Sequence, residues 1–208
     1  MNNVAMKNMS AQVRFDWVAR FYDAFNFFIE RFASRSRKEI LRQAEGNILE
    51  VGVGTGSSLR DYPLGEQIVA VDISKEMLRR AEVKLKKNNG EIELCRGDVR
   101  NLPFKDETFD TIFSSWVFCS VTDPVRGLIE VRRVLKKEGK LLMLEHVKSE
   151  NKALGYLMDK SNPLAARLGV GDINRDTLAN LRKAGFKVKE ERNLAYDVVK
   201  AIVAARRI

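Results

Sequence analysis

Cysteine and histidine are almost absent from this chain of 208 residues, which holds only Cys95, Cys119 and His146. These few residues form no cluster with the spacing of a zinc or iron site, so we predict that the protein binds no metal. Two cysteines give no disulfide framework, and the first residues lack the basic and apolar regions of a secretory signal. We therefore expect a cytoplasmic protein.

Long apolar runs, repeats and low-complexity segments are also missing. No stretch approaches the roughly 20 consecutive apolar residues that span a membrane. Hydrophobic residues nevertheless make up 45% of the chain, which is enough for one sizeable core. Positive charge is in excess, with a net charge of +9. Such a surface attracts nucleic acid or acidic lipid head groups, although basic residues interleaved with glutamate also occur on ordinary solvated surfaces.

Apolar segments rich in β-branched residues alternate with helical segments along the middle of the chain. The predicted strands are residues 48–53, 67–71, 92–95, 111–114 and 140–146. Between them we predict a short helix from Ser57, a helix over residues 75–87 that Ser74 caps, and a helix that Asp123 and Pro124 open and that ends near Gly139. This alternation indicates βαβ units, an α/β fold and a parallel sheet.

The C-terminal end of the chain departs from this alternation. A helix predicted over residues 175–184 is followed by two strand-like segments, residues 186–193 and 198–204. Because only a short turn joins the two segments, they must pair in antiparallel orientation. The sequence therefore predicts a Rossmann-like, mostly parallel sheet that ends in an antiparallel hairpin.

A glycine-rich turn follows the first predicted strand and reads Gly52-Val53-Gly54-Thr55-Gly56. Glycines at the carboxyl end of a strand let the backbone bend sharply and approach a ligand. Asp72 ends the next strand about 20 residues later, where a carboxylate can accept hydrogen bonds from both hydroxyls of a ribose. The alternative role for Asp72 is to cap the following helix, but Ser74 is already available for that. Ser57 stands where a dinucleotide site needs its last glycine, which disfavours NAD.

Gly97-Asp98-Val99 follows the third predicted strand. A carboxylate at this place can accept a hydrogen bond from the amino group of adenine, or it can simply cap a turn. The motif alone leaves both roles open.

Together these motifs resemble, in order and spacing, those of the class I S-adenosylmethionine-dependent methyltransferases. The motifs that carry the resemblance are residues 49–56, 71–74 with Met77, 97–99 followed by Leu102-Pro103-Phe104, and Phe109-Asp110. The similarity extends from about residue 15 to the C-terminus. Within the class, the chain is similar to enzymes that methylate ubiquinone and menaquinone precursors, phospholipid head groups and thiols. The resemblance implies a seven-stranded sheet and the cofactor S-adenosyl-L-methionine.

The resemblance also implies a cofactor site. Its residues are Tyr22, Glu50, Gly52, Gly54, Thr55, Gly56, Asp72, Ile73, Met77, Asp98, Val99 and Ser115. The glycines border the methionine portion, and Glu50 positions either the turn or the amino group. Asp72 is expected to hold the ribose, and Ile73 and Met77 to flank the adenine. Asp98 and Val99 are expected to form hydrogen bonds with the edge of the adenine ring. Ser115 faces the methionine end, and Tyr22 either lies across the cofactor or is a core aromatic residue.

His146 is the candidate catalytic residue. Methyl transfer from a sulfonium needs alignment and exclusion of water more than catalytic side chains. An acceptor that must lose a proton needs a base, and this is the only histidine. Glu145-His146 is similar to a Glu-His pair of the thiol and phospholipid methyltransferases. The alternative is a histidine that only satisfies a loop hydrogen bond.

The segment after the fourth predicted strand bears on the methyl acceptor. Residues 114–120 lack the Asn/Asp-Pro-Pro-Tyr/Phe motif of methyltransferases that act on adenine or glutamine nitrogen. Trp116, Phe118 and Cys119 offer an apolar wall instead, or they belong to the core. We therefore expect a small hydrophobic or lipid-like acceptor. Quinone precursors fit less well, since the glycine-rich turn lacks the acidic residue that follows it in those enzymes.

The N-terminal segment, residues 1–45, is predicted to form a helical lid on a methyltransferase domain of residues 46–208. Residues 10–45 read as a helix with one apolar stripe that includes Tyr22 and a second that includes Trp17 and Phe28. The second stripe either packs between two protein layers or dips into an anionic membrane, with arginines near the phosphates. We expect peripheral membrane contact from the second arrangement.

Two other functions remain as alternatives. An RNA methyltransferase would explain the positive charge, but no RNA-binding module or interleaved aromatic and basic motif is present, so we do not expect nucleic acid as a partner. A cofactor-binding regulator without catalysis would retain the same cofactor motifs. The sequence carries no signal of an oligomeric state.

Overall fold

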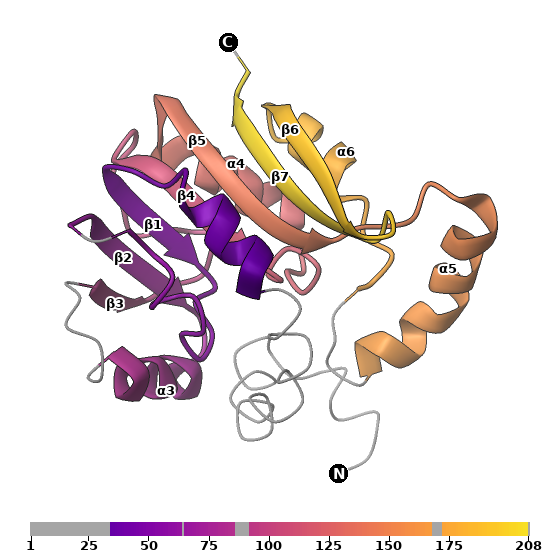
Figure 1. The fold of residues 1–208 in the computed structure, drawn as a ribbon, viewed down its shortest axis with the longest axis horizontal. Helices are drawn as coiled ribbons and strands as arrows, with labels where there is room; N and C mark the ends of the chain where they lie inside the picture. The colour runs from indigo at the N-terminus through magenta and orange to yellow at the C-terminus, as the bar shows by residue number, and fades with distance from the viewer. Residues whose placement is uncertain (1–33, 64, 86–91, 168–171, 208) are drawn as a thin grey trace.

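The computed structural model describes residues 34–63, 65–85, 92–167 and 172–207, which form one central sheet with helices around it. The strand order of the sheet is β3-β2-β1-β4-β5-β7-β6 (Figure 1). The strands are β1 (Asn47–Val51), β2 (Gln67–Asp72), β3 (Ile92–Arg96), β4 (Phe109–Ser115), β5 (Leu135–His146), β6 (Phe186–Ala195) and β7 (Val199–Arg206). The strands β1 to β5 pair in parallel, and β7 runs antiparallel to β5 and β6. This confirms the predicted seven-stranded fold with its C-terminal hairpin.

Two layers of helices cover the sheet. The helices are a segment at residues 34–41, α3 (Lys75–Leu85), α4 (Pro124–Val134), α5 (Lys152–Arg167) and α6 (Thr177–Lys183). In Figure 1, α4 and α6 lie behind the sheet and the helix at residues 34–41 lies in front of it, while α5 stands apart. None of the helices in these described ranges is long and apolar enough to cross a lipid bilayer.

The core follows from the alternation of side chains along the central strands. In β5, Leu141 and Met143 pack in the cluster that contains α4 and α6, whereas Leu142 and Leu144 pack with the helix at residues 34–41. Successive residues of a strand point to opposite faces, so a strand buried on both faces must be apolar throughout. The continuous apolar run of this strand therefore has a direct structural cause.

The predicted helix caps are confirmed at both sites. The Oγ of Ser74 accepts a hydrogen bond from the backbone N–H of Met77 at 3.1 Å. The side chain of Asp123 accepts one from Arg126 N–H at 3.0 Å, with Pro124 at the first helical position. These bonds satisfy N–H groups that have no partner within a helix.

Two predicted elements are wrong, and one helix is missing from the prediction. No helix begins at Ser57, because the chain after β1 passes through turns as far as Pro63. The helix α4 ends at Val134 instead of near Gly139, since Leu135 has an extended backbone and pairs with Phe109 of β4. The helix α5 was not predicted at all, and it contains Pro163, which weakens a helical sequence pattern.

A buried ion pair ties the helix at residues 34–41 to the loop after β1. Arg37 Nε lies 2.7 Å from Asp61 Oδ2, and the two side chains are 2% and 0% exposed. Arg37 also donates a hydrogen bond to the carbonyl of Ser57 at 3.2 Å. Since a charge enclosed in this way is stable only with a partner, Arg37 links the helix to the loop that precedes β2.

We predict that Arg37→Leu destabilises the protein by about 3–5 kcal/mol, because it leaves the buried carboxylate of Asp61 without its nearest cation. The matched control is Arg35→Leu on the same helix, where the arginine is 90% exposed and the change is expected to stay within about 0.5 kcal/mol. Urea unfolding measures both free energies. Equal losses in the two variants would contradict a structural role of the pair.

Candidate cofactor and active site

A cavity lies at the carboxyl ends of the central parallel strands, where the loops after β1, β2, β3 and β4 meet. Of the predicted cofactor residues, it is lined by Gly52, Gly54, Asp72, Ile73, Met77, Asp98, Val99 and Ser115. Open α/β sheets bind ligands at this edge. The structure therefore brings together residues that belong to separate motifs and lie far apart in the sequence.

The glycine-rich turn has left-handed backbone conformations at Gly52, Gly54 and Gly56, with φ values of 72°, 56° and 78°. A Cβ atom on Gly54 would meet no atom within 4 Å, so this glycine leaves open space beside the cavity. A Cβ atom on Gly56 would lie 3.0 Å from the Cα of Ala81, so this glycine lets α3 pack closely. Gly54 thus borders the cavity, whereas Gly56 serves the packing of α3.

Asp72 connects the turn after β1 to the loop after β2. Its Oδ2 accepts a hydrogen bond from Gly54 N–H at 2.8 Å, and its Oδ1 accepts one from Ser74 N–H at 2.9 Å. The carboxylate is 9% exposed and lines the cavity. A carboxylate oxygen can accept more than one hydrogen bond, which is the chemistry that recognition of ribose hydroxyls requires.

Glu50, Thr55 and Gly56 do not line the cavity. Glu50 is buried and accepts hydrogen bonds from Ser58 Oγ at 2.5 Å and from Tyr62 Oη at 2.8 Å. Burial raises the pKa of Glu50 to about 7. Of the two roles considered for Glu50, these contacts favour positioning of the turn. The Oγ of Thr55 accepts a hydrogen bond from Lys84 of α3 at 3.0 Å.

Asp98 lines the cavity together with Arg100, which the sequence analysis did not single out. The guanidinium of Arg100 contacts both oxygens of Asp98, with Nη2 2.6 Å from Oδ2, and Arg100 N–H donates to Oδ1 at 2.9 Å. The hydrogen bond from Arg100 lowers the pKa of the Asp98 carboxyl. Asp98 therefore stays charged, and it combines the turn-capping role with a position on the cavity wall.

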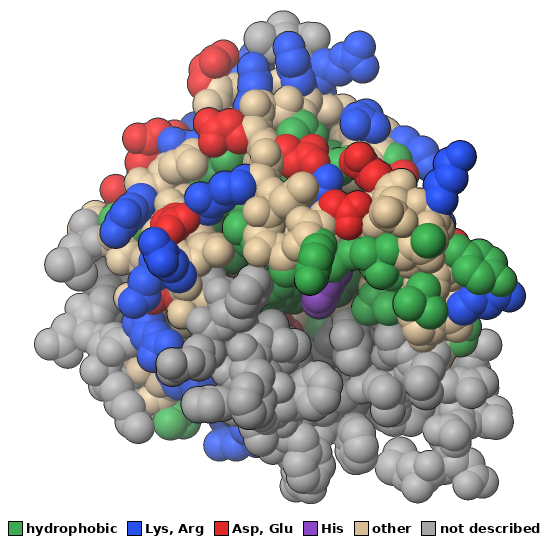
Figure 2. Space-filling model, turned by 45° about the vertical axis from the view of Figure 1, so that its right-hand side comes forward, with side chains coloured by type: hydrophobic (Ala, Val, Ile, Leu, Met, Phe, Trp, Pro, Cys, Tyr) green, Lys and Arg blue, Asp and Glu red, His purple; other side chains and the backbone are tan. Residues whose placement is uncertain are grey.

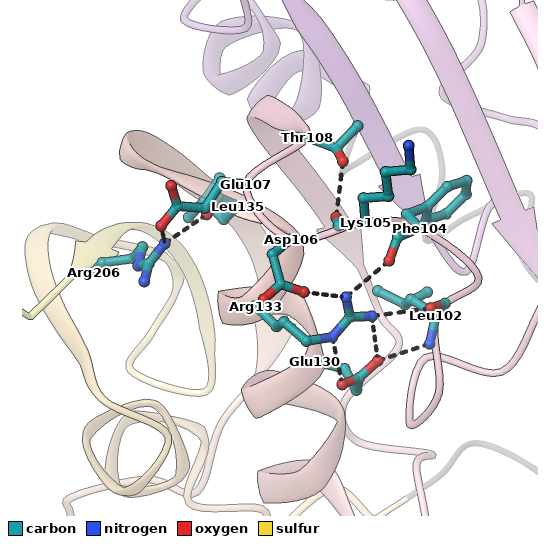
Figure 3. Close-up of polar contacts among 10 residues, drawn as sticks. All are labelled: Leu102, Phe104, Lys105, Asp106, Glu107, Thr108, Glu130, Arg133, Leu135 and Arg206. Carbon is teal, nitrogen blue, oxygen red and sulfur yellow. Dashed lines mark hydrogen bonds and ion pairs between the residues drawn. The ribbon is translucent and has the colours of Figure 1, made fainter.

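Arg133 of α4 fixes the loop that follows Asp98 (Figure 3). Its guanidinium donates hydrogen bonds to the carbonyls of Leu102 and Phe104 at 3.0 and 2.8 Å, and it pairs with Glu130 and Asp106. Arg133 thus holds residues 102–104 on α4 through their backbone carbonyls.

Glu145 holds the segment after β4. Its buried Oε1 accepts hydrogen bonds from the backbone N–H groups of Val117 at 3.0 Å and Phe118 at 3.1 Å, and from Ser114 Oγ at 3.3 Å. Burial raises the pKa of Glu145 to about 7. The carboxylate therefore positions the cavity wall next to Ser115.

His146 ends β5 close to the cavity, but it does not line it. Its ring centroid is 4.5 Å from that of Trp116, which does line the cavity. Burial lowers the pKa of His146, so the imidazole is neutral at neutral pH. Figure 2 shows the histidine directly beside hydrophobic side chains. A neutral imidazole next to the cavity has the protonation state that a base requires.

The predicted apolar wall is only partly present. Trp116 lines the cavity, but Phe118 and Cys119 are buried away from it, and Val117 and Val121 take their place. Burial also raises the pKa of Cys119 to about 12, so its thiol is protonated at neutral pH. Tyr22 and the apolar stripes predicted for the N-terminal segment lie outside the described residues.

Comparisons with known proteins agree with this geometry. A family model described as a methyltransferase domain matches residues 49–143. A phosphatidylethanolamine N-methyltransferase of Cereibacter sphaeroides is 36% identical over 139 residues, which cover 63% of this chain and 68% of that protein. A ubiquinone/menaquinone biosynthesis C-methyltransferase of Citrifermentans bemidjiense is 30% identical over 156 residues, which cover 70% of this chain and 66% of that protein.

Solved structures show the same fold. An S-adenosylmethionine-dependent methyltransferase of Thermotoga maritima has a TM-score of 0.68 and 26% identity, covering 91% of this chain and 98% of the other. The shared fold, the relatives found by sequence and the cavity at the strand ends of this chain all lead to one assignment. The chain belongs to the class I S-adenosylmethionine-dependent methyltransferases, and S-adenosyl-L-methionine is its cofactor.

Proposed function

We propose that this enzyme methylates a small hydrophobic or lipid-like acceptor, such as a phospholipid amine, a quinone precursor or a thiol. The observation that carries the proposal is the apolar wall that Trp116, Val117 and Val121 form in the cavity beyond Ser115. The relatives named for phosphatidylethanolamine and for ubiquinone or menaquinone biosynthesis support the same acceptor classes. An apolar wall favours such acceptors over a charged polynucleotide.

In the proposed mechanism, most residues bind the cofactor and align it with the methyl acceptor. Bound S-adenosylmethionine supplies a methyl group that positive sulfur already activates. Asp72 holds the ribose, Ile73 and Met77 flank the adenine, and the turn around Gly54 borders the methionine portion. The apolar wall excludes water from the acceptor side, which favours direct displacement. His146 accepts the proton of an acceptor that must be deprotonated.

We further propose that residues 1–45 form a lid whose second apolar stripe rests on an anionic membrane. The support is the sequence pattern, in which Trp17 and Phe28 share one helical side and arginines flank them. A lipid-like acceptor would reach the cavity from such a surface. RNA methylation and a purely regulatory role remain outcomes of the acceptor test below.

The acceptor class follows from incubating the protein with tritium-labelled S-adenosylmethionine and fractionated cell extract. We expect label in a lipid, quinone or thiol fraction, because the cavity wall is apolar. Label in RNA with salt-sensitive binding would instead establish an RNA methyltransferase. An intact cofactor site without label in any fraction would support the regulator.

We predict that Asp72→Asn weakens S-adenosylmethionine binding at least about tenfold, since a hydrogen bond to a charged group contributes about 1.5–3 kcal/mol. Calorimetry measures the affinity. The matched control is Asp110→Asn at the opposite end of the sheet, where the carboxylate pairs with Lys136 and affinity should not change. An unchanged affinity in a folded Asp72→Asn variant would remove Asp72 from the site.

We predict that His146→Asn lowers kcat by about 10²- to 10⁴-fold if the methylated atom must lose a proton. In the wild type, kcat/KM should stay level through neutral pH and fall in acid as His146 becomes protonated, below the ordinary pKa of 6.5. Glu145→Gln is the control, because Glu145 itself titrates near pH 7. Persistence of the acid limb in His146→Asn, or its loss in Glu145→Gln, would assign the proton transfer to another group.

We predict that the protein cosediments with anionic vesicles more than with neutral ones, and that salt weakens this binding, since surface charges are screened over about 10 Å at 0.1 M. Trp17→Ala with Phe28→Ala should reduce the bound fraction. Ile129→Ala is the control, because this exposed apolar residue lies on α4. Equal vesicle binding by the wild type and the variant with Trp17→Ala and Phe28→Ala would contradict membrane contact through the N-terminal stripe.

A further inference from the structure

Trp116 has an unusual backbone conformation. Its φ is +59°, in the left-handed region that bulky side chains rarely adopt. Such a conformation costs free energy, and it persists only where the surrounding structure imposes it. Here the hydrogen bond from Trp116 N–H to Leu144 O at 2.9 Å and the bonds from the next two N–H groups to Glu145 impose it. The fold thus stores strain to place this indole.

The polar atoms of Trp116 and His146 are also unusual. The indole Nε1 and the imidazole Nδ1 are both buried, and neither has a hydrogen-bond partner among the residues that the structure describes. Buried polar groups in proteins are nearly always paired, and an unpaired donor costs free energy. The two rings contact each other, with their centroids 4.5 Å apart. The two rings that carry these atoms therefore lie side by side, and Trp116 borders the cavity.

Trp116 and His146 lie where the methyl acceptor, rather than the cofactor, is expected to bind. Trp116 lines the cavity directly after Ser115, whereas the residues proposed for the adenine and ribose lie on the loops after β2 and β3. His146 contacts the indole and does not line the cavity itself. A molecule that reaches the pair would lie at the end of the cavity formed by β4 and β5.

We propose that Trp116 determines acceptor specificity by donating a hydrogen bond from its indole N–H to an oxygen of the methyl acceptor, with His146 accepting the proton of the same group. An indole N–H only donates, and a neutral imidazole nitrogen accepts. A hydroxyl group satisfies both at once, whereas an ammonium group offers no lone pair to the indole. The structure thus favours a phenolic hydroxyl on an apolar body. This inference rests on the proposed small-molecule function.

The reaction balances with these two residues. The hydroxyl proton passes to His146. The oxygen, or a ring carbon conjugated to it, attacks the methyl group as the carbon–sulfur bond breaks, and the electron pair of that bond stays on sulfur. When a ring carbon is methylated, that carbon then loses its proton and the oxygen gains one, which restores the aromatic ring. The indole hydrogen bond stabilises the negative charge that develops on the oxygen.

Binding of naphthol, methoxynaphthalene and naphthalene tests the hydrogen bonds one at a time. Naphthol can pair with both residues, the methoxy compound can only accept from the indole, and naphthalene can do neither. With the cofactor site filled by S-adenosylhomocysteine, calorimetry should rank the affinities in that order. Trp116→Phe retains an aromatic ring without the donor, so it should weaken naphthol binding about threefold to tenfold and leave naphthalene binding unchanged.

Several results would overturn this inference. An equal loss of naphthol and naphthalene binding in Trp116→Phe would mean that the ring only packs. Equal affinity for all three probes in the wild type would exclude hydroxyl recognition even if the variant fails to fold. Methylation of phosphatidylethanolamine vesicles without naphthol binding would overturn the inference and leave the proposed function intact.

The ring contact can be measured separately, because the chain has only two tryptophans. In Trp17→Phe, Trp116 is the sole indole, and a protonated imidazole quenches the fluorescence of an indole in contact with it. Burial lowers the pKa of His146 from its ordinary value of 6.5, so the fluorescence should fall only in acid below that pH. The step should vanish in His146→Asn and persist in Glu145→Gln, which removes the neighbouring carboxyl. A flat titration would contradict the pairing.

Discussion

Buried carboxylates that pair with loop donors are the constraint on which the site depends. At the carboxyl ends of parallel strands, the chain leaves the sheet and its N–H groups lose their ladder partners. Glu145 accepts the N–H groups of residues 117 and 118, and Asp72 accepts those of Gly54 and Ser74. Glu50 secures the loop after β1 through two hydroxyl groups. Each carboxylate thus holds a loop that borders or supports the cavity.

The same arrangement explains why the site needs few catalytic groups. Methyl transfer depends on the alignment of nucleophile, methyl group and sulfur, so rigid walls contribute more than additional acids or bases. Arg133 fixes the loop after β3 through two carbonyls, and Arg37 ties the loop after β1 to the helix at residues 34–41. The left-handed Trp116 is the one wall residue that the fold places at the cost of strain. Strain at this residue agrees with the proposed role in acceptor binding, because strained backbone conformations that lower stability are found mainly at functional sites.

Several residues that share a motif have different roles in three dimensions. Gly54 leaves open space beside the cavity, whereas Gly56 of the same turn allows α3 to pack. Of the aromatic and thiol wall expected after β4, only Trp116 lines the cavity, because a turn held by Glu145 directs Phe118 and Cys119 into the interior. Asp98 shares the cavity wall with Arg100, a neighbour whose importance depends on the ion pair between them.

The sequence by itself determined the order of the strands, the helices α3, α4 and α6, the C-terminal hairpin and the position of the cofactor motifs. Hydrophobic alternation, caps such as Ser74 and Asp123, and glycine-rich turns are local signals, so they can be read without the fold. Only the tertiary structure decided where α4 gives way to β5, that Glu50 supports a loop, and that Trp116 meets His146. These features depend on contacts between residues far apart in the chain. Leu135 extends because it pairs with Phe109, and the indole meets the imidazole because β4 and β5 are neighbours in the sheet.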